Sequence, residues 1–259
     1  MDFTVKQYTQ LLKSLQDAGF FFQTFEEYLQ NPALGRIIIL RHDVDLLPQN
    51  SLQFAQIQHD LGVRGSYYFR AVPESWDEKI IMEIHALGHE IGYHYENLTT
   101  CKGNIVLAIE DFKLNLKHLR NLVPVSTICM HGSPRSPYDS KDLWKAFDYR
   151  IFDIIGEPYF DLNFDRLFYL TDTGRRWDGW KISVRDKMPQ QEKWAKNGLI
   201  FHSTSDIIDA ANEGRLPDKI MMTFHPQRWN DKPLPWLKEL VFQNIKNQGK
   251  RVLIKLRKK

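Results

Sequence analysis

Residues 37–45 read IIILRHDVD, an apolar run that passes directly into a cluster of ionisable side chains. The four apolar residues are typical of a buried strand. The residues that follow, Arg41, His42, Asp43 and Asp45, lose hydration if they are packed against a core. Such a cluster therefore requires a compensating partner, and a metal ion or a network of salt bridges is the usual one.

The bulk composition is that of a globular protein without a strongly charged partner. Of the 259 residues, 42% are hydrophobic and 26% are charged, and the formal net charge is +3. A charge this small gives no argument for nucleic acid or an acidic membrane surface as a partner. The basic end of the chain, KRVLIKLRKK at 250–259, contributes much of it, and we expect a solvated terminal strand there.

Cysteine usage and the N-terminal segment indicate a cytoplasmic protein. Two cysteines, Cys101 and Cys129, imply no disulfide framework, and we expect them to be free and buried. The first residues, MDFTVKQYTQLLKSL, lack the features of a signal peptide, and no run approaches the ~20 apolar residues that span a bilayer. We therefore expect a cytoplasmic location and no membrane span.

Short apolar or β-branched runs alternate with helical patterns along the chain. Strands are expected at 36–43, 65–70, 88–95, 125–131 and 219–225, and weaker ones near 149–154, 166–171, 181–185 and 198–202. Helices are expected at 48–62, 76–87, 104–121, from 140 onward and around 234–247. This alternation predicts an α/β fold with a parallel sheet, and the number of strands favours a closed barrel. We interpret 1–259 as one domain, with a helical extension at 1–35 and the barrel at 36–259.

Polar side chains lie at the predicted carboxyl ends of the strands, where parallel α/β folds gather their functional groups. Beyond the cluster after the first strand, these residues are Arg70, His94, Glu96, His131 and His225. The joint occurrence of Asp45, His94, His131 and His225 on separate strand ends indicates a metal centre. Carboxylate and imidazole ligands suit Zn²⁺, with Fe²⁺ or Co²⁺ as substitutes.

Three motifs in this order resemble those of the polysaccharide deacetylases, the NodB-homology domain of carbohydrate esterase family 4. They are RHDVD at 41–45, GHEIGYH at 88–94 and MMTFH at 221–225. The resemblance implies a distorted (β/α)7-type barrel that hydrolyses N-acetyl groups of amino sugars. It also implies that Asp43 is the general base, that Asp45 and His94 bind the metal, and that His225 is the general acid.

The sequence departs from the family pattern at two places. The family's metal motif is His-X-X-X-His, but HYENL at 94–98 has Leu98 where the second histidine is expected. The arginine–proline motif after the fourth strand is also absent, and MHGSPRS at 130–136 stands in its place. Our hypothesis is that His131 supplies the missing ligand; Glu96 is the competing third ligand.

Substrate contacts are expected around TDTGRRWDGW at 171–180. Arg175 and Arg176 offer planar donors for a carboxylate or phosphate, and Trp177 and Trp180 offer rings for a sugar. A plain surface loop explains the same residues equally well. Other candidates for substrate contact are Arg70, Asp172 and Trp229. Arg41 or Asp172 is expected to orient Asp43 or His225.

The function that follows is a Zn²⁺-dependent deacetylase acting on an N-acetylated amino sugar. A cytoplasmic enzyme cannot reach mature cell-wall polymer, so we expect a glycan intermediate or a nucleotide- or lipid-linked precursor of surface polysaccharide. Two alternatives remain: a metal-independent amidohydrolase acting on a non-sugar amide, and a non-catalytic member that binds glycan. Metal content separates the first alternative from the main hypothesis, and the presence of both Asp43 and His225 argues against the second, because binding alone needs neither a base nor an acid.

Overall fold

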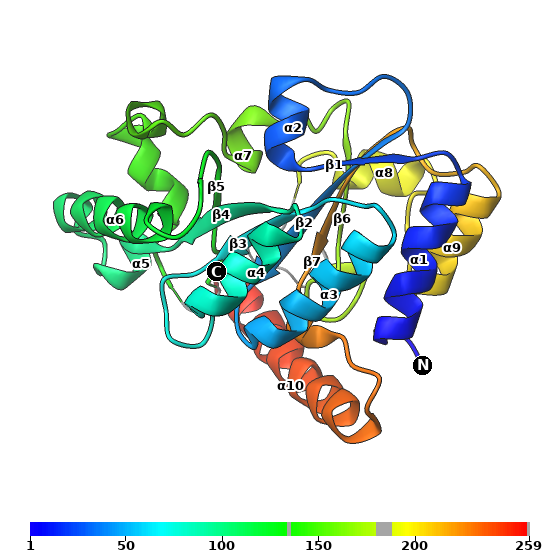
Figure 1. Ribbon diagram of the computed structural model, residues 1–259. Coiled ribbons are helices and arrows are strands. Elements are labelled where there is room, and N and C mark those ends of the chain that lie inside the picture. Colours follow the sequence, from blue (N-terminus) through cyan, green and yellow to red (C-terminus); the bar gives the residue numbers. More distant parts are fainter. Residues whose placement is uncertain (134–135, 180–187, 258–259) are drawn as a thin grey trace. The chain divides into compact units, whose positions relative to one another are not determined.

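The computed structural model describes residues 1–133, 136–179 and 188–257, with side chains through 249. It consists of two compact units. The terminal unit comprises 1–21, 34–38 and 163–259, and the central unit comprises 22–33 and 39–162. Each unit has parallel strands flanked by helices (Figure 1), so the expected α/β class is confirmed.

The central unit is built on four parallel strands in the order β5-β4-β3-β2. These are β2 (Ile37–Val44, which begins in the terminal unit), β3 (Ser66–Phe69), β4 (Glu90–Tyr95) and β5 (Ile128–Met130). Every residue of these strands is buried. Burial on both faces is typical of parallel sheets and explains why β2 begins as a continuous apolar run.

Helices precede, connect and follow these strands, and the ends of several carry the expected start and stop signals. They are α2 (Phe25–Gln30), α3 (Pro48–Asp60), α4 (Glu78–Ala86), α5 (Asn97–Thr100), α6 (Ile105–Arg120) and α7 (Pro158–Asp161). Pro48 lies in the first turn of α3, and Gly62, at φ +67°, follows its end. The side chain of Asn104 accepts the N–H groups of Val106 and Leu107 at the start of α6.

The register of the strands aligns their carboxyl ends. His42 and Asp43 lie opposite Tyr67 and Tyr68, while His94 lies opposite Cys129. Residues just beyond the strands, among them Asp45, Arg70, Glu96 and His131, therefore leave the sheet at one edge of the central unit.

The terminal unit contains the parallel pair β6 (Phe168–Thr171) and β7 (Lys219–Phe224). Its helices are α1 (Val5–Asp17), α8 (Gln191–Lys196), α9 (Thr204–Asn212) and α10 (Pro233–Arg257). Helices α1 and α9 pack side by side (Figure 1). The aromatic rings of Tyr8, Phe224 and Trp229 form a buried cluster of edge-to-face and tilted contacts.

The segment 1–35 is helical as expected, with one addition. The short strand β1 (Phe21–Gln23) lies between α1 and α2 and pairs with β2. The weaker strand expected near 166–171 is confirmed as β6. The strand expected near 181–185 lies outside the described residues.

Three other expectations about secondary structure are wrong. Residues 149–154 form the 3₁₀ helix η2 (Tyr149–Phe152), because the Asp148 side chain accepts the Arg150 N–H and starts a turn instead of a strand. Residues 198–202 form a loop between α8 and the capping box of Ser203 and Asp206 that begins α9.

The third wrong expectation concerns the basic end of the chain. Helix α10 continues through Arg257, so residues 250–257 are helical rather than a terminal strand. Lysine, arginine and leucine are good helix formers, and a helix already in progress extends readily through them. The segment SKDLWK at 140–145 is helical as expected, although as the 3₁₀ helix η1 (Ser140–Lys145). Within the described part of the chain, no helix is long and apolar enough to cross a membrane.

Replacing Gly92 by alanine should loosen the sheet of the central unit. Gly92 lies opposite Tyr68 in β3, and a Cβ there would overlap the Tyr68 ring and lie 3.0 Å from the Thr127 carbonyl oxygen. We expect Gly92→Ala to lower the free energy of unfolding by about 1–3 kcal/mol, measured by urea denaturation. Gly249→Ala is the control, because nothing lies within 4 Å of its added methyl group. Identical midpoints for the two variants would contradict this packing.

Candidate metal centre and its surroundings

The end of β2 places its polar side chains on two faces. Arg41 donates two hydrogen bonds to Asp43, from Nε to Oδ1 at 2.8 Å and from Nη2 to Oδ2 at 2.7 Å. Both side chains are buried, so each charge compensates the other. The ring of His42, on the other face, stacks on Tyr67 at a centroid distance of 4.2 Å and accepts a hydrogen bond from Gln58. Arg41 thus orients Asp43, whereas His42 is a packing residue.

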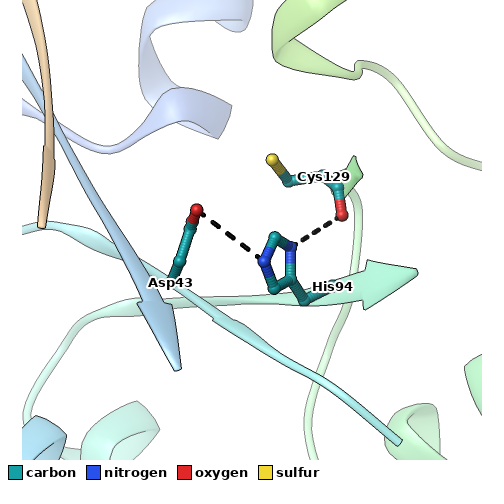
Figure 2. A group of neighbouring side chains, drawn as sticks. All are labelled: Asp43, His94 and Cys129. Carbon is teal, nitrogen blue, oxygen red and sulfur yellow. Dashed lines mark hydrogen bonds and ion pairs between the residues drawn. The ribbon is translucent and has the colours of Figure 1, made fainter. Parts of the chain in front are cut away.

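His94, on β4, is held in the tautomer that a metal ligand needs. Its Nδ1 lies 2.9 Å from the carbonyl oxygen of Cys129, so Nδ1 carries the proton and the Nε2 lone pair remains (Figure 2). That Nε2 atom lies 3.7 Å from Asp43 Oδ2 and 3.8 Å from Asp45 Oδ1. Burial lowers the pKa of His94 to about 4 despite the nearby Asp43 carboxylate. The ring is therefore neutral near pH 7.

His131 follows β5 and is oriented by Glu96. The Nδ1 atom of His131 lies 2.9 Å from Glu96 Oε2, and its Nε2 lies 3.4 Å from Asp45 Oδ1. Burial lowers the pKa of His131, but the hydrogen bond to Glu96 and the charges of Asp45 and Glu96 outweigh it, so the pKa is raised. Without a metal, a proton on His131 is thus stabilised by carboxylates on both sides.

Glu96 is itself held by Arg70, at the end of β3. The Arg70 guanidinium donates from Nε at 2.8 Å and lies 2.6 Å through Nη2 from the same oxygen, Glu96 Oε1. Burial raises the pKa of Glu96, but His131 and Arg70 outweigh burial and lower it to about 2. Arg70 also donates to the carbonyl oxygen of Asp45 at 3.1 Å. The expected substrate residue Arg70 is therefore engaged in holding Glu96 and Asp45.

Asp45, His94 and His131 together offer three ligand atoms that all lie within 4.8 Å of one another. Ligands at zinc distances of about 2.0–2.1 Å in a tetrahedron lie about 3.4 Å apart, close to the separations from Asp45. The donor set of one carboxylate and two imidazoles suits zinc, and both imidazoles have Nδ1 engaged, which directs Nε2 to the centre. These residues thus fit a divalent metal of the zinc type.

Leu98 stands where the family pattern has its second histidine, so this position offers no ligand. Leu98 belongs to the short helix α5 and is buried. Glu96 is the competing ligand in our sequence-based hypothesis. Its Oε1 atom contacts Arg70, and its Oε2 atom contacts His131. The geometry therefore favours His131 in the centre, with Glu96 behind it.

Two buried groups near this centre were missed by sequence reasoning. The Cys129 thiol forms a second close group with Asp43 and His94 (Figure 2). Glu157 accepts the N–H of Met130, next to His131, at 3.0 Å. Burial raises the pKa of Glu157 to about 7 although the N–H groups of Met130 and Tyr159 stabilise its charge. A single cysteine in a strand and a glutamate before proline carry no sequence signal for these positions.

In the terminal unit, Asp172 organises the residues around His225. Asp172 Oδ1 lies 2.6 Å from His225 Nδ1, and Oδ2 accepts the His225 backbone N–H at 3.0 Å. Trp229 Nε1 and Arg228 Nη1 also donate to this carboxylate, at 2.7 and 3.1 Å. Burial raises the pKa of Asp172, but His225 and Arg228 outweigh it and lower the pKa. Asp172 therefore contacts His225, and Arg41 contacts Asp43, the two pairs among which the sequence left the choice open.

The remaining candidates for substrate contact are engaged with other residues of the terminal unit. The indole of Trp177 is 4% exposed and donates to Thr204, and Trp229 is 1% exposed, so neither ring has a face for a sugar. Arg175 is buried and donates to the Trp236 carbonyl, while Arg176 is paired with Asp178. Trp180 lies outside the described residues.

No protein-family model matches this sequence, and no curated protein matches it. Solved structures do resemble it, at low identity. A CE4 family pseudoenzyme from Bacillus anthracis shares 12% identity over 83% of this chain, with a TM-score of 0.46; this chain covers 62% of that one.

Two further solved structures resemble the chain to a similar degree. The Xyl-CE4 domain of a multidomain xylanase from the hindgut metagenome of Trinervitermes trinervoides shares 13% identity over 83% of this chain and 84% of that chain, with a TM-score of 0.44. The polysaccharide deacetylase Bc1974 from Bacillus cereus shares 11% identity over 83% and 89%, with a TM-score of 0.43.

Removing His131 and Glu96 separately should distinguish a ligand from its support. We expect His131→Ala to abolish tight zinc binding, because it removes one of three ligands. Glu96→Gln should weaken binding about 10–100-fold, because it loosens the tautomer and orientation of His131. Isothermal titration with Zn²⁺ measures both, and Glu110→Gln, at an exposed ion pair, is the matched control. Unchanged affinity in the His131→Ala protein would rule out this ligand set.

Removing the Asp172 carboxylate should destabilise the terminal unit. Asp172→Ala leaves a buried arginine without its anion, which costs about 3–5 kcal/mol. The exposed Asp209, replaced by alanine, is the control. The folded pKa of Asp172 lies below its unfolded value of about 3.9, so its contribution is present above that pH and is lost as the pH falls. Urea unfolding at neutral and acidic pH tests this, and a difference between variants that persists undiminished at low pH would contradict it.

Proposed function

We propose that this chain is a divergent, metal-dependent deacetylase of the polysaccharide deacetylase kind that hydrolyses the N-acetyl group of an amino sugar. The observation that carries the proposal is the convergence of Asp45, His94 and His131 beside the arginine-held carboxylate of Asp43. The Nε2 atoms of both imidazoles lie within 3.8 Å of Asp45 Oδ1, an arrangement that suits a metal ion shared among the three residues. The metal we propose is Zn²⁺, held by these three residues.

A bound Zn²⁺ supplies Lewis-acid polarisation of the amide carbonyl and of a water molecule. Asp43 accepts the proton of the attacking water, because its carboxylate lies 3.7 Å from His94 Nε2 and is fixed in orientation by Arg41. Asp45 remains a ligand and does not exchange protons. Asp43 is our proposal for the base because the buried guanidinium of Arg41 lies behind it and fixes its orientation.

His225 is our proposal for the general acid. Its Nδ1 proton is donated to Asp172, which leaves Nε2 to carry a proton to the leaving amine. The Asp172 carboxylate thereby fixes the orientation of the His225 ring. We expect His225→Asn to lower the rate of acetate release without lowering the affinity for zinc.

The substrate class that we propose is a glycan intermediate, or a nucleotide- or lipid-linked acetamido sugar, in the cytoplasm. Cys101 and Cys129 both carry thiols instead of a disulfide, which suits a reducing compartment. The arginine and tryptophan residues of 171–177 give no support to a particular sugar, since they are engaged within the terminal unit. The acetamido group is therefore the part of the substrate that the chemistry identifies.

Acetate release from N-acetylglucosamine oligomers and from UDP-N-acetylglucosamine tests the proposal. The zinc-loaded protein should release acetate, and Asp43→Asn should reduce the rate about 10²–10⁴-fold while zinc affinity is kept. Asp60→Asn, on the exposed side of α3, is the matched control.

Two results would contradict the proposal in different ways. Full activity after removal of metal by a chelator would favour a metal-independent amidohydrolase. Glycan binding without any turnover, unchanged in Asp43→Asn, would identify a non-catalytic glycan-binding protein.

A further inference from the structure

Helix α10 has one side attached to its own unit and the opposite side exposed. On the attached side Gln243 and Asn247 are buried, and the Asn247 amide donates to the Gly174 carbonyl at 2.9 Å. Arg175 also donates to the Trp236 carbonyl at 3.0 Å. The exposed apolar side chains of the helix are between 49% and 80% exposed and form what we call the apolar stripe: Leu234, Leu237, Val241, Phe242 and Ile245.

The stripe is continuous along the helix. Leu234, Leu237, Val241 and Ile245 follow one another at intervals of three and four residues, which places them on one side of a helix. Single exposed apolar residues are normal, but a stripe along about three turns marks a surface that interacts with a partner. Figure 1 shows α10 as one continuous helix from orange to red.

The charge of this segment identifies the partner's chemistry. Residues 233–259 contain eight lysines and arginines and a single carboxylate, Glu239. The formal charge of the whole chain is only +3, so the rest of the chain is net acidic and the basic charge is concentrated in this one segment. Lys246 lies beside the stripe, with Nζ 4.0 Å from the centroid of the Phe242 ring. The basic end that the sequence shows thus continues the helix that carries the apolar stripe.

A second copy of this helix is a poor occupant of the stripe, because two such basic segments would repel each other. An apolar stripe bordered by lysines instead matches a surface that is both anionic and apolar beneath its charges. We propose that α10 binds the surface of an anionic phospholipid bilayer, with the apolar stripe between the lipid headgroups and exposed lysines such as Lys238 and Lys246 near the phosphates. This proposal is independent of the proposed deacetylase activity.

Sedimentation of the full chain with lipid vesicles tests the proposal. The probes are vesicles of phosphatidylcholine containing phosphatidylglycerol, compared with vesicles of phosphatidylcholine alone. We expect binding only to the anionic vesicles, and weaker binding as the salt concentration rises. The variant Leu237→Gln/Val241→Gln/Ile245→Gln should lower the affinity at least about tenfold.

The matched control is Val106→Gln/Leu107→Gln, which removes exposed apolar side chains from α6 and should bind as the unmodified protein does. Circular dichroism and the urea midpoint confirm that each variant is folded. Equal binding by the triple variant, or no binding of the unmodified protein to anionic vesicles, would overturn the proposal. A dimer in solution that the triple variant abolishes, without vesicle binding, would assign the stripe to self-association and would overturn it too.

Discussion

The parallel register of β2, β3, β4 and β5 is the constraint on which the proposed centre depends. Side chains alternate between the two faces of a strand, so a shift of one residue in β4 would exchange His94 for Tyr93 or Tyr95. In the observed register His94 lies opposite Cys129, and the Cys129 carbonyl fixes its tautomer. The same edge receives Asp45 from β2 and His131 from β5. The register of the strands thus brings these proposed ligands together, although they are distant in sequence.

Charge compensation explains how so many ionisable groups are tolerated at one edge. The buried carboxylates of Asp43 and Glu96 each have an arginine, Arg41 and Arg70, within hydrogen-bonding distance. Asp45 lies near the Nε2 atoms of His94 and His131, at 3.8 and 3.4 Å. A cation shared among this carboxylate and the two imidazoles would compensate its charge. These contacts are the physical basis for proposing Asp45 as a ligand and Asp43 as a base.

Much of this arrangement could be predicted from sequence, because strands and their polar ends leave a local signal. The apolar run before RHDVD identified β2, and Asp45, His94 and His131 could be placed at strand ends. The role of Glu96 could not, because it depends on Arg70, 26 residues away in the chain. The contact of His94 with the Cys129 carbonyl could not be predicted either, because every residue has a backbone carbonyl. The burial of Trp177 depends on Phe3 and Thr204, which are distant in sequence.

The most direct test of the central claim is anomalous X-ray diffraction at the zinc absorption edge from crystals soaked with Zn²⁺. The account predicts one strong peak within about 2.0–2.2 Å of an Asp45 carboxylate oxygen and of the Nε2 atoms of His94 and His131, with Glu96 still on His131 Nδ1. A peak bonded to Glu96 in place of His131, or no peak at this edge of the sheet, would contradict it.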